Sequence, residues 1–257
     1  MVVNRLSVYC LLAGCSVIAA EQPVLTVLSE VQRQPLEQVP LREYGKGAAV
    51  IFIGGFGDEI SGIMLNAMLR LPSLSGEQET RAYYHWHAGR PDNVEQGATV
   101  ICNQIAAYRR NNSGADIVLI GHSMGASMAL RTAHLLNPAD GRVFVITLDP
   151  ADRGYTPSRP AAVKWWGNAF VTNSLSGHDY IAVMGGRWNS CRQADVNLRF
   201  DGRNRDEAGV HYIHDNALSL LLSRGSKNAV SLYDILRMEQ ITEEPGNNRE
   251  VGESTDK

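Results

Sequence analysis

The sequence predicts an α/β protein with a mostly parallel, twisted sheet and helices on both faces of that sheet. Strand-like apolar runs alternate with helix-like runs along most of the chain, which is typical of sheets built from strand–helix–strand units. Residues 115–136 contain a strand, a glycine turn and a helix in direct succession. With 257 residues, the chain is long enough for one domain with a sizeable core.

The individual elements follow from short apolar runs bounded by glycine, proline and polar residues. In chain order, the expected strands are 24–28 and 41–44 as antiparallel starting strands, then 48–53, 82–87, 117–120, 142–148, 180–184 and 196–200. The expected helices are 59–71, stopped by Pro72, then 93–110, the segment after Ser123, and 215–223. Right-handed crossovers would place the carboxyl ends of the parallel strands along one edge of the sheet, where active sites form.

The N-terminus is typical of an export signal rather than of the fold. A small positive region at Asn4-Arg5 precedes an apolar run, Leu6–Ala13, that is too short to span a bilayer as a helix. The residues Leu12–Cys15 resemble a bacterial lipobox, which implies a signal peptide over 1–14, a lipid-modified Cys15 and an anchor or linker over 15–22. Ser16 after the cysteine favours the outer membrane of a bacterial envelope; an ordinary signal peptide or a short buried segment is the alternative.

The remaining chain divides into a main domain, 23–240, and a polar tail, 241–257, that we expect to be disordered. The net charge of −3, without a basic stripe, makes nucleic acid an improbable partner. Cys102 and Cys191 would face an oxidising compartment, where they either pair or remain buried thiols.

The most informative motif is Gly-His-Ser-Met-Gly at 121–125, between the strand 117–120 and an alanine- and leucine-rich helix. A chain that reverses sharply there would place Ser123 at the tip of the turn, and the flanking glycines would keep side chains out of the crowded space. The helix N-terminus would present partial positive charge to an anion that forms beside Ser123. This context predicts a serine nucleophile; a structural turn with an idle serine is the alternative.

Together these residues resemble the α/β-hydrolase fold, in its lipase, esterase and thioesterase branch. The resemblance covers roughly 48–222 and includes the motifs GHSMG, IGGFGD and TLDP and a late histidine, in the family's order of Ser, acid and His. It implies catalysis by Ser123 as nucleophile, a histidine base and an orienting carboxylate.

The base is expected among two late histidines. His211 lies in the loop before the last predicted helix, where the family places its base, so we favour it. His214 is the alternative, although it lies where it would cap that helix.

The acid is expected to be Asp149, which ends the strand after the nucleophile's helix. Most family members place the acid one strand later, but the run expected there ends at 184–189 without a carboxylate. Asp195 and Asp201 are weaker candidates, and a loop-capping role before Pro150 is the structural alternative for Asp149.

For the oxyanion hole, the resemblance implies two backbone N–H donors, those of Met124 and of Phe56 in the turn Gly54-Gly55-Phe56. The connection between Asp149 and Tyr180 is where the family inserts a cap or lid. Trp165 and Trp166 in it would line an acyl pocket, touch a membrane or belong to the core.

No metal site and no cofactor are expected. His85 and His87 share one strand face, but a third ligand is missing from the pattern, so core or surface roles are favoured.

The sequence therefore predicts a serine hydrolase that cleaves carboxylic esters, with acyl lipids among the candidate substrates, through a Ser-His-Asp triad and an acyl-enzyme. The expected partners are this ester substrate and a membrane reached through the lipid anchor, while the oligomeric state stays open. Two alternatives remain: an acyltransferase that passes the acyl group to an alcohol, and a non-catalytic envelope lipoprotein that uses the scaffold for binding.

Overall fold

The computed structural model describes residues 35–74, 79–86, 93–174, 177–225 and 230–241. The predicted signal peptide, the lipidation site Cys15, the strand predicted at 24–28 and the polar tail lie outside these residues. Within the described ranges, none of the helices combines the length and the apolar character that a membrane span requires.

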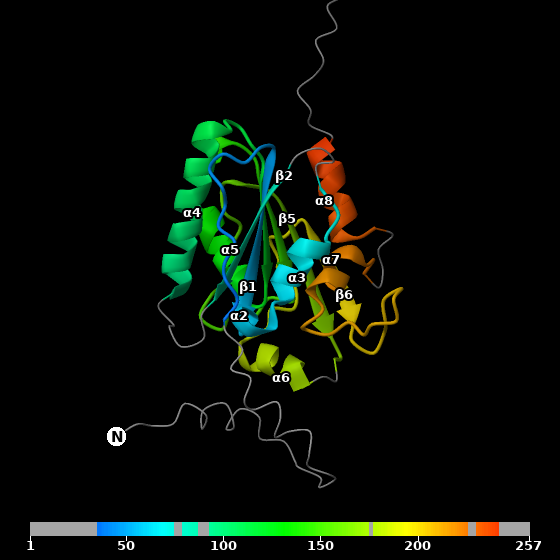
Figure 1. Ribbon diagram of the computed structural model, residues 1–257. Helices are drawn as coiled ribbons and strands as arrows, with labels where there is room; N and C mark the ends of the chain where they lie inside the picture. Colours follow the sequence, from blue (N-terminus) through cyan, green and yellow to red (C-terminus); the bar gives the residue numbers. More distant parts are fainter. Residues whose placement is uncertain (1–34, 75–78, 87–92, 175–176, 226–229, 242–257) are drawn as a thin grey trace, which may run out of the picture. The chain divides into compact units, whose positions relative to one another are not determined.

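A six-stranded sheet forms the centre of the fold, with the order β2-β1-β3-β4-β5-β6 and all neighbouring strands parallel (Figure 1). The strands are β1 (Ala48–Phe56), β2 (Glu79–Trp86), β3 (Ile117–His122), β4 (Val143–Leu148), β5 (Val163–Thr172) and β6 (Val196–Asp201). The chain runs from β1 to the edge strand β2 and returns to β3 on the other side of β1. It then adds β4, β5 and β6 in order. This arrangement confirms the predicted parallel sheet.

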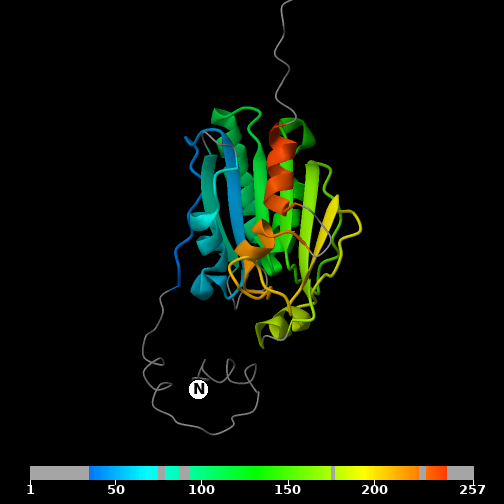
Figure 2. The same cartoon turned by 90° about the vertical axis from the view of Figure 1, so that its right-hand side faces the viewer.

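Helices cover both faces of the sheet (Figures 1 and 2). The helices are α2 (Asp58–Ser61), α3 (Ile63–Arg70), α4 (Asn93–Asn111), α5 (Met124–Leu135), α6 (Gly177–Met184), α7 (Ala217–Leu222) and α8 (Leu232–Ile241), with a short 3₁₀ turn, η1 (Pro138–Asp140). Helices α4 and α5 pack on one face, and α3, α7 and α8 on the other. Helix α6 lies beyond the carboxyl ends of the strands, the edge where the active site is expected.

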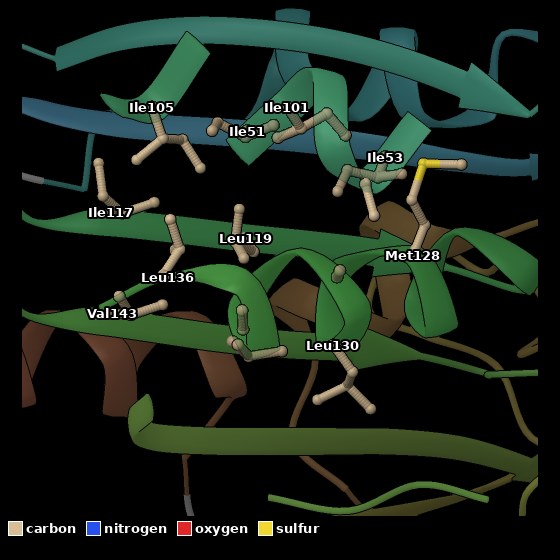
Figure 3. Packing of buried hydrophobic residues seen from close by; sticks show 14 of the residues in the cluster. Ile51, Ile53, Ile101, Ile105, Ile117, Leu119, Met128, Leu130, Leu136 and Val143 are labelled. Atoms are coloured by element: carbon tan, nitrogen blue, oxygen red, sulfur yellow. The ribbon is translucent and has the colours of Figure 1, made fainter. Parts of the chain in front are cut away.

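The strands divide their side chains between two hydrophobic clusters because successive residues point to opposite faces. In β1, Ile51 and Ile53 join Ile101 and Ile105 of α4 in one cluster, while Phe52 joins the cluster on the other face (Figure 3). These side chains are completely or almost completely buried. Burial on both faces explains why the strands are continuous apolar runs in the sequence.

The main departure from the expected fold concerns the strand after β4. The sequence predicts it at 180–184, but that segment is helix α6, and the place beside β4 is taken by β5 at 163–172. The predicted strand was wrong because a run of five apolar residues fits either a strand or one face of a short helix. In α6, Ala182 is buried, whereas Tyr180 and Val183 are exposed.

Strand β5 lies within the segment that the resemblance assigned to a cap or lid. Trp165 and Trp166 belong to opposite core clusters, so the core alternative for this pair is confirmed. The polar residue Asn168 interrupts the apolar pattern of β5, but its amide is completely buried. It accepts from the Thr147 hydroxyl on β4 and donates to the Asn197 side chain on β6. These side-chain bonds satisfy the buried amide and link three strands.

Three smaller expectations also change. Residues 41–44 form a turn rather than a strand, and Val39 makes the antiparallel bridge to Tyr83 instead. The helix expected over 59–71 is divided into α2 and α3 at Gly62, whose φ of 64° lies in the left-handed region that favours glycine. Helix α8 has no counterpart among the sequence-based predictions.

Candidate active site

Ser123 stands in a strained turn between β3 and α5. Its φ of 55° and ψ of −125° are unusual for a residue with a side chain, and α5 begins at the next residue. A Cβ on Gly125 would lie 2.2 Å from the Ile53 carbonyl oxygen, and one on Gly121 would lie 2.4 Å from the Gly125 carbonyl oxygen. Both glycines are therefore required by backbone contacts, as the motif predicts for a sharp strand-to-helix turn.

The Ser123 hydroxyl faces a histidine and, through it, a carboxylate. Ser123 Oγ lies 3.0 Å from His214 Nε2, and His214 Nδ1 lies 2.7 Å from Asp149 Oδ2. All three side chains are buried. Because the carboxylate only accepts hydrogen bonds, Nδ1 carries the proton, and Nε2 is left to accept one from the serine. The order of these groups is that of a nucleophile, a base and an orienting acid.

His214, not His211, occupies the place beside Ser123, so the preference for His211 was wrong. His211 Nδ1 lies 3.2 Å from the Gly202 carbonyl, and His211 also pairs with Arg205 in an isolated bridge. The preference depended on His214 capping the last predicted helix. That helix starts two residues later than expected, and Asn216 stands at its N-cap. His214 therefore lies in the segment before α7, from which its side chain reaches the edge of the sheet.

Asp149 is the carboxylate that meets the histidine, as predicted. It has a positive φ of 39° directly after β4, and its Oδ1 accepts the Val171 backbone N–H of β5 at 2.9 Å. Complete burial raises the pKa of Asp149, but the His214 hydrogen bond and charge, the Arg187 charge and the Val171 N–H lower it, and the net pKa lies below its ordinary value. The carboxylate is therefore ionised in the resting protein.

The weaker acid candidates are occupied elsewhere. Asp195 accepts the Trp166 backbone N–H and pairs with Arg159, while Asp201 pairs with Arg203. These contacts involve residues on and next to β5 and β6, and none of them involves Ser123.

The sequence reasoning missed Arg187 and Asp179. Arg187 Nη2 lies 2.8 Å from Asp149 Oδ2 and 2.5 Å from Asp179 Oδ1, and these three charged side chains are all nearly or fully buried. Arg187 lies within residues 184–189, where a carboxylate was expected but is missing. The sequence feature that could have identified Arg187 is a cationic residue directly after Gly185-Gly186, at the end of α6.

His122, which precedes Ser123, also belongs to this cluster of residues. Its Nε2 lies 2.7 Å from the His214 carbonyl oxygen, and the two histidine rings are 4.6 Å apart. Burial, followed by the His214 charge, lowers the pKa of His122 to about 4. The neutral ring donates to the carbonyl and fixes the backbone of the loop that carries His214.

The two turns that the resemblance assigned to the oxyanion hole lie against each other. A Cβ on Gly55 would lie 2.7 Å from Ser123 Cβ and 2.9 Å from the Met124 backbone nitrogen. The sequence predicts a turn over Gly54-Gly55-Phe56, but β1 extends to Phe56, so it is the end of this strand that adjoins the start of α5. Behind it, Asp58 is buried against Gly54 and accepts the Tyr83 hydroxyl at 2.7 Å. Burial raises the pKa of Asp58 above its ordinary value.

The sequence also contains His85 and His87 as metal-ligand candidates and Cys102 and Cys191 as a candidate disulfide. His85 is buried, with Nε2 3.0 Å from the Leu36 carbonyl oxygen, and His87 lies outside the described residues. Cys102 and Cys191 are free thiols, so the alternative without a disulfide holds. Over the described ranges, no group of three side chains has the composition and proximity to hold a metal ion.

The chain resembles the crystal structures of a protein assigned as a cell surface hydrolase from Lactobacillus plantarum WCFS1 (10% identity, 78% of this chain and 94% of that chain, TM-score 0.43) and of a lipase-esterase related protein from Clostridium acetobutylicum ATCC 824 (13%, 79% and 96%, TM-score 0.38). No curated protein matches this chain in sequence. A sequence model described as the alpha/beta hydrolase family matches residues 48–228, which is well over half of the chain. The chain therefore belongs to the alpha/beta hydrolase family.

Proposed function

We propose that the protein is a serine hydrolase that cleaves carboxylic esters through an acyl-enzyme on Ser123. The observation that carries the proposal is the pair of hydrogen-bond distances that join Ser123 to His214 and His214 to Asp149. A serine hydroxyl is a weak nucleophile at neutral pH, and a base within 3.0 Å, oriented by a buried carboxylate, is the arrangement that activates it. Membership of the alpha/beta hydrolase family supports hydrolysis as the reaction class.

In the first half of the reaction, Ser123 Oγ attacks the ester carbonyl carbon while His214 Nε2 takes the hydroxyl proton. Asp149 stabilises the imidazolium that forms. The negative charge on the former carbonyl oxygen is met by the backbone N–H groups of Met124 and Phe56, and the α5 N-terminus adds its dipole. As the tetrahedral intermediate collapses, Nε2 gives the proton to the departing alcohol and the acyl group stays on Ser123.

In the second half, water takes the place of the alcohol. His214 Nε2 removes a proton from the water, the resulting hydroxide attacks the acyl carbon, and the serine oxygen leaves with the proton returned by Nε2. The carboxylic acid is released and the resting enzyme is restored. An acyltransferase would use the same first half, so only the acceptor distinguishes the two reactions.

Apolar surface around the site supports an ester whose acyl group is apolar. Phe56, the last residue of β1, is 40% exposed. Helix α6, whose Asp179 pairs with Arg187 beside Asp149, exposes four more apolar side chains: Tyr180, Ile181, Val183 and Met184. A short helix that exposes four apolar side chains is the kind of surface that receives an apolar ligand or partner.

The test is covalent labelling with a fluorophosphonate probe, followed by turnover of p-nitrophenyl esters with acyl chains of increasing length. We expect wild type to be labelled on Ser123 and to release p-nitrophenol. Ser123→Ala removes one oxygen from a buried turn, so it should fold but lose the label, and its kcat/KM should fall by roughly four orders of magnitude. Ester turnover by Ser123→Ala at the wild-type rate would refute the proposal.

We also propose that the mature protein begins at Cys15 and is held at a bacterial membrane, with the outer membrane favoured, by lipid attached to that cysteine. The lipobox-like sequence Leu12–Cys15 supports this, although it lies outside the described residues. Two or three acyl chains give stable anchoring, whereas one is marginal. Cys15→Ser should abolish both acylation and lipoprotein-type cleavage, measured by mass spectrometry of the membrane fraction. Normal cleavage of that variant would contradict the proposal.

A further inference from the structure

A buried arginine joins two carboxylates beside Ser123. The same nitrogen, Arg187 Nη2, lies 2.8 Å from Asp149 Oδ2 and 2.5 Å from Asp179 Oδ1. The side chains of Asp149, Asp179 and Arg187 are 0%, 7% and 10% exposed, respectively. We refer to these three residues as the charged triplet. Because they are buried, their mutual interactions are only weakly screened by solvent and salt.

The charged triplet meets His214 at a single atom. Asp149 Oδ2 accepts both from His214 Nδ1, at 2.7 Å, and from Arg187 Nη2, so the imidazole and the guanidinium cannot be further apart than the sum of these two distances. A positive charge so close to His214 opposes the formation of imidazolium, the step for which Asp149 is present. Arg187 alone would therefore weaken the base that Asp149 supports.

Asp179 supplies the missing negative charge. The triplet holds two carboxylates and one guanidinium, so it carries a net charge of −1 next to a neutral imidazole. When His214 takes the serine proton, the whole group becomes neutral. Without Asp179, the triplet would be neutral at rest, and protonation would leave a net positive charge in a buried site, which is unfavourable.

We propose that Arg187 and Asp179 are positioning residues that set the charge facing His214: Arg187 fixes the Asp149 carboxylate, and Asp179 offsets the cost that the Arg187 charge would impose on the imidazolium. This inference rests on the proposed function, because it assigns a role in the same proton transfer. The Ser174 hydroxyl donates to the second Asp179 oxygen and completes the support on the α6 side.

Other charged or titratable groups surround the triplet and His214. Among the described residues they include His122 on β3, which contacts the His214 ring, and Asp215 next to His214. In the loop after β4, Arg153 donates to the Met184 carbonyl, and the backbone carbonyl of Asp152 accepts the Trp188 ring N–H. Each of these groups is kept in the variants used below. Differences in pH dependence between these variants therefore report the effect of changing the charges of the triplet.

The diagnostic variant is Asp179→Asn, which has nearly the same shape but lacks the charge. We expect the acidic limb of the kcat/KM–pH profile to move to lower pH by roughly one unit, because imidazolium becomes harder to form. The plateau of kcat/KM should fall about tenfold, because imidazolium also forms during the reaction. The rate of fluorophosphonate labelling of Ser123 should follow the same limb.

The double variant Arg187→Gln, Asp179→Asn removes one charge of each sign and restores a net −1. We expect its acidic limb to return to within about 0.3 pH units of wild type, since the charge facing His214 is restored. A purely structural role predicts the opposite order, in which the double variant is the more damaged. The matched control is Arg142→Gln, which breaks the Arg142–Asp116 pair at the far end of β3 and β4 and should leave the limb in place.

Two outcomes overturn the proposal: an unshifted limb in Asp179→Asn, or a double variant no closer to wild type than that single variant. Failure of the proposed function is recognised separately, as wild type that neither reacts with the probe nor turns over esters. In that case the charges are tested without turnover, by following the His214 ring signals against pH in NMR spectra. The ring should take up its proton at lower pH in Asp179→Asn and at the wild-type pH in the double variant, and any other order overturns the proposal.

Discussion

At the scale of single residues, the site depends on one loop position. His214 and His211 differ by three residues, yet only His214 reaches both Ser123 and Asp149. His211 instead faces the Gly202 carbonyl in a turn that ends before the site. The side-chain chemistry of the two is identical, so the backbone path alone decides which of them can act as the base.

This difference gives a direct test of the corrected base. His214→Gln should lower kcat/KM for a p-nitrophenyl ester by about four orders of magnitude, because a glutamine cannot take the serine proton. His211→Gln should stay within about threefold of wild type, because its ring contacts neither Ser123 nor Asp149. Steady-state kinetics on both variants decide the matter, and a loss confined to His211→Gln would reverse the assignment.

His122 predicts a pH-dependent stability. Its pKa is about 4 in the folded protein and about 6.5 in an unfolded chain, so the unfolded chain binds the proton first as the pH falls. The free energy of unfolding should therefore decrease as the pH is lowered from 6.5 and level off near 4, with a total contribution of about 3 kcal/mol.

The measurement is urea unfolding at a series of pH values between 7 and 4, on wild type and on His122→Gln. Glutamine keeps an N–H donor for the His214 carbonyl but does not titrate, so its stability should depend less steeply on pH. Parallel curves for the two proteins would show that His122 does not carry this dependence.

At the scale of elements, the turn between β3 and α5 holds the nucleophile because three backbone segments approach closely. The carbonyl of Ile53 on β1 lies against Gly125 on α5, and Gly55, near the end of the same strand, lies against Ser123. These contacts are between backbone atoms or the first side-chain carbon, which have no rotamers to adjust. The position of Ser123 therefore depends on the mutual packing of β1, β3 and α5.

Gly125→Ala should accordingly damage both stability and labelling. The new Cβ would lie 2.2 Å from a backbone oxygen, so α5 must shift, and we expect a loss of about 2 kcal/mol or more in the free energy of unfolding. Gly97→Ala on α4 is the matched control, because its Cβ would meet only the flexible end of Met128. It should change the free energy of unfolding by less than about 1 kcal/mol. Urea unfolding and probe labelling of both variants test this, and equal losses would contradict the packing argument.

At the scale of the whole molecule, the described fold begins at Pro35, and the hydrogen bonds that join Ser123, His214 and Asp149 lie among the described residues. The sheet places Ser123 and Asp149 at the carboxyl ends of β3 and β4, and the segment before α7 brings His214 to them. Catalysis and membrane attachment should therefore be separable properties.

A shortened protein that begins at Glu21 tests this separation. It lacks Cys15 but keeps every described residue, so its kcat/KM on a short soluble p-nitrophenyl ester should equal that of the lipidated protein within about twofold. On esters presented in vesicles it should be slower, because the anchor no longer raises the local substrate concentration. Loss of activity on the soluble ester would show that residues before 21 contribute to the fold or the site.

The sequence by itself determined the parallel α/β fold and the positions of Ser123 and Asp149 directly after strands. The alternation of buried strands and helices identifies the sheet, because strands covered on both faces are continuous apolar runs. Ser123 comes directly after β3 and Asp149 directly after β4. The carboxyl ends of parallel strands lie along the same edge of the sheet, so the sequence already places these two residues at that edge. These features depend on local pattern and on the rule that places strand ends at one edge.

The tertiary structure decided what depends on competition between distant segments. The run 180–184 and the segment 163–172 are both short and apolar, and only packing beside β4 shows that the second is the strand. His214 lies beside Ser123 because helix α7 starts two residues later than the helix pattern suggests, which leaves His214 in the preceding loop. Arg187 pairs with Asp149, which follows β4, and with Asp179 of α6. Local sequence patterns do not show that a charged side chain will be buried and paired with a residue far away in the chain.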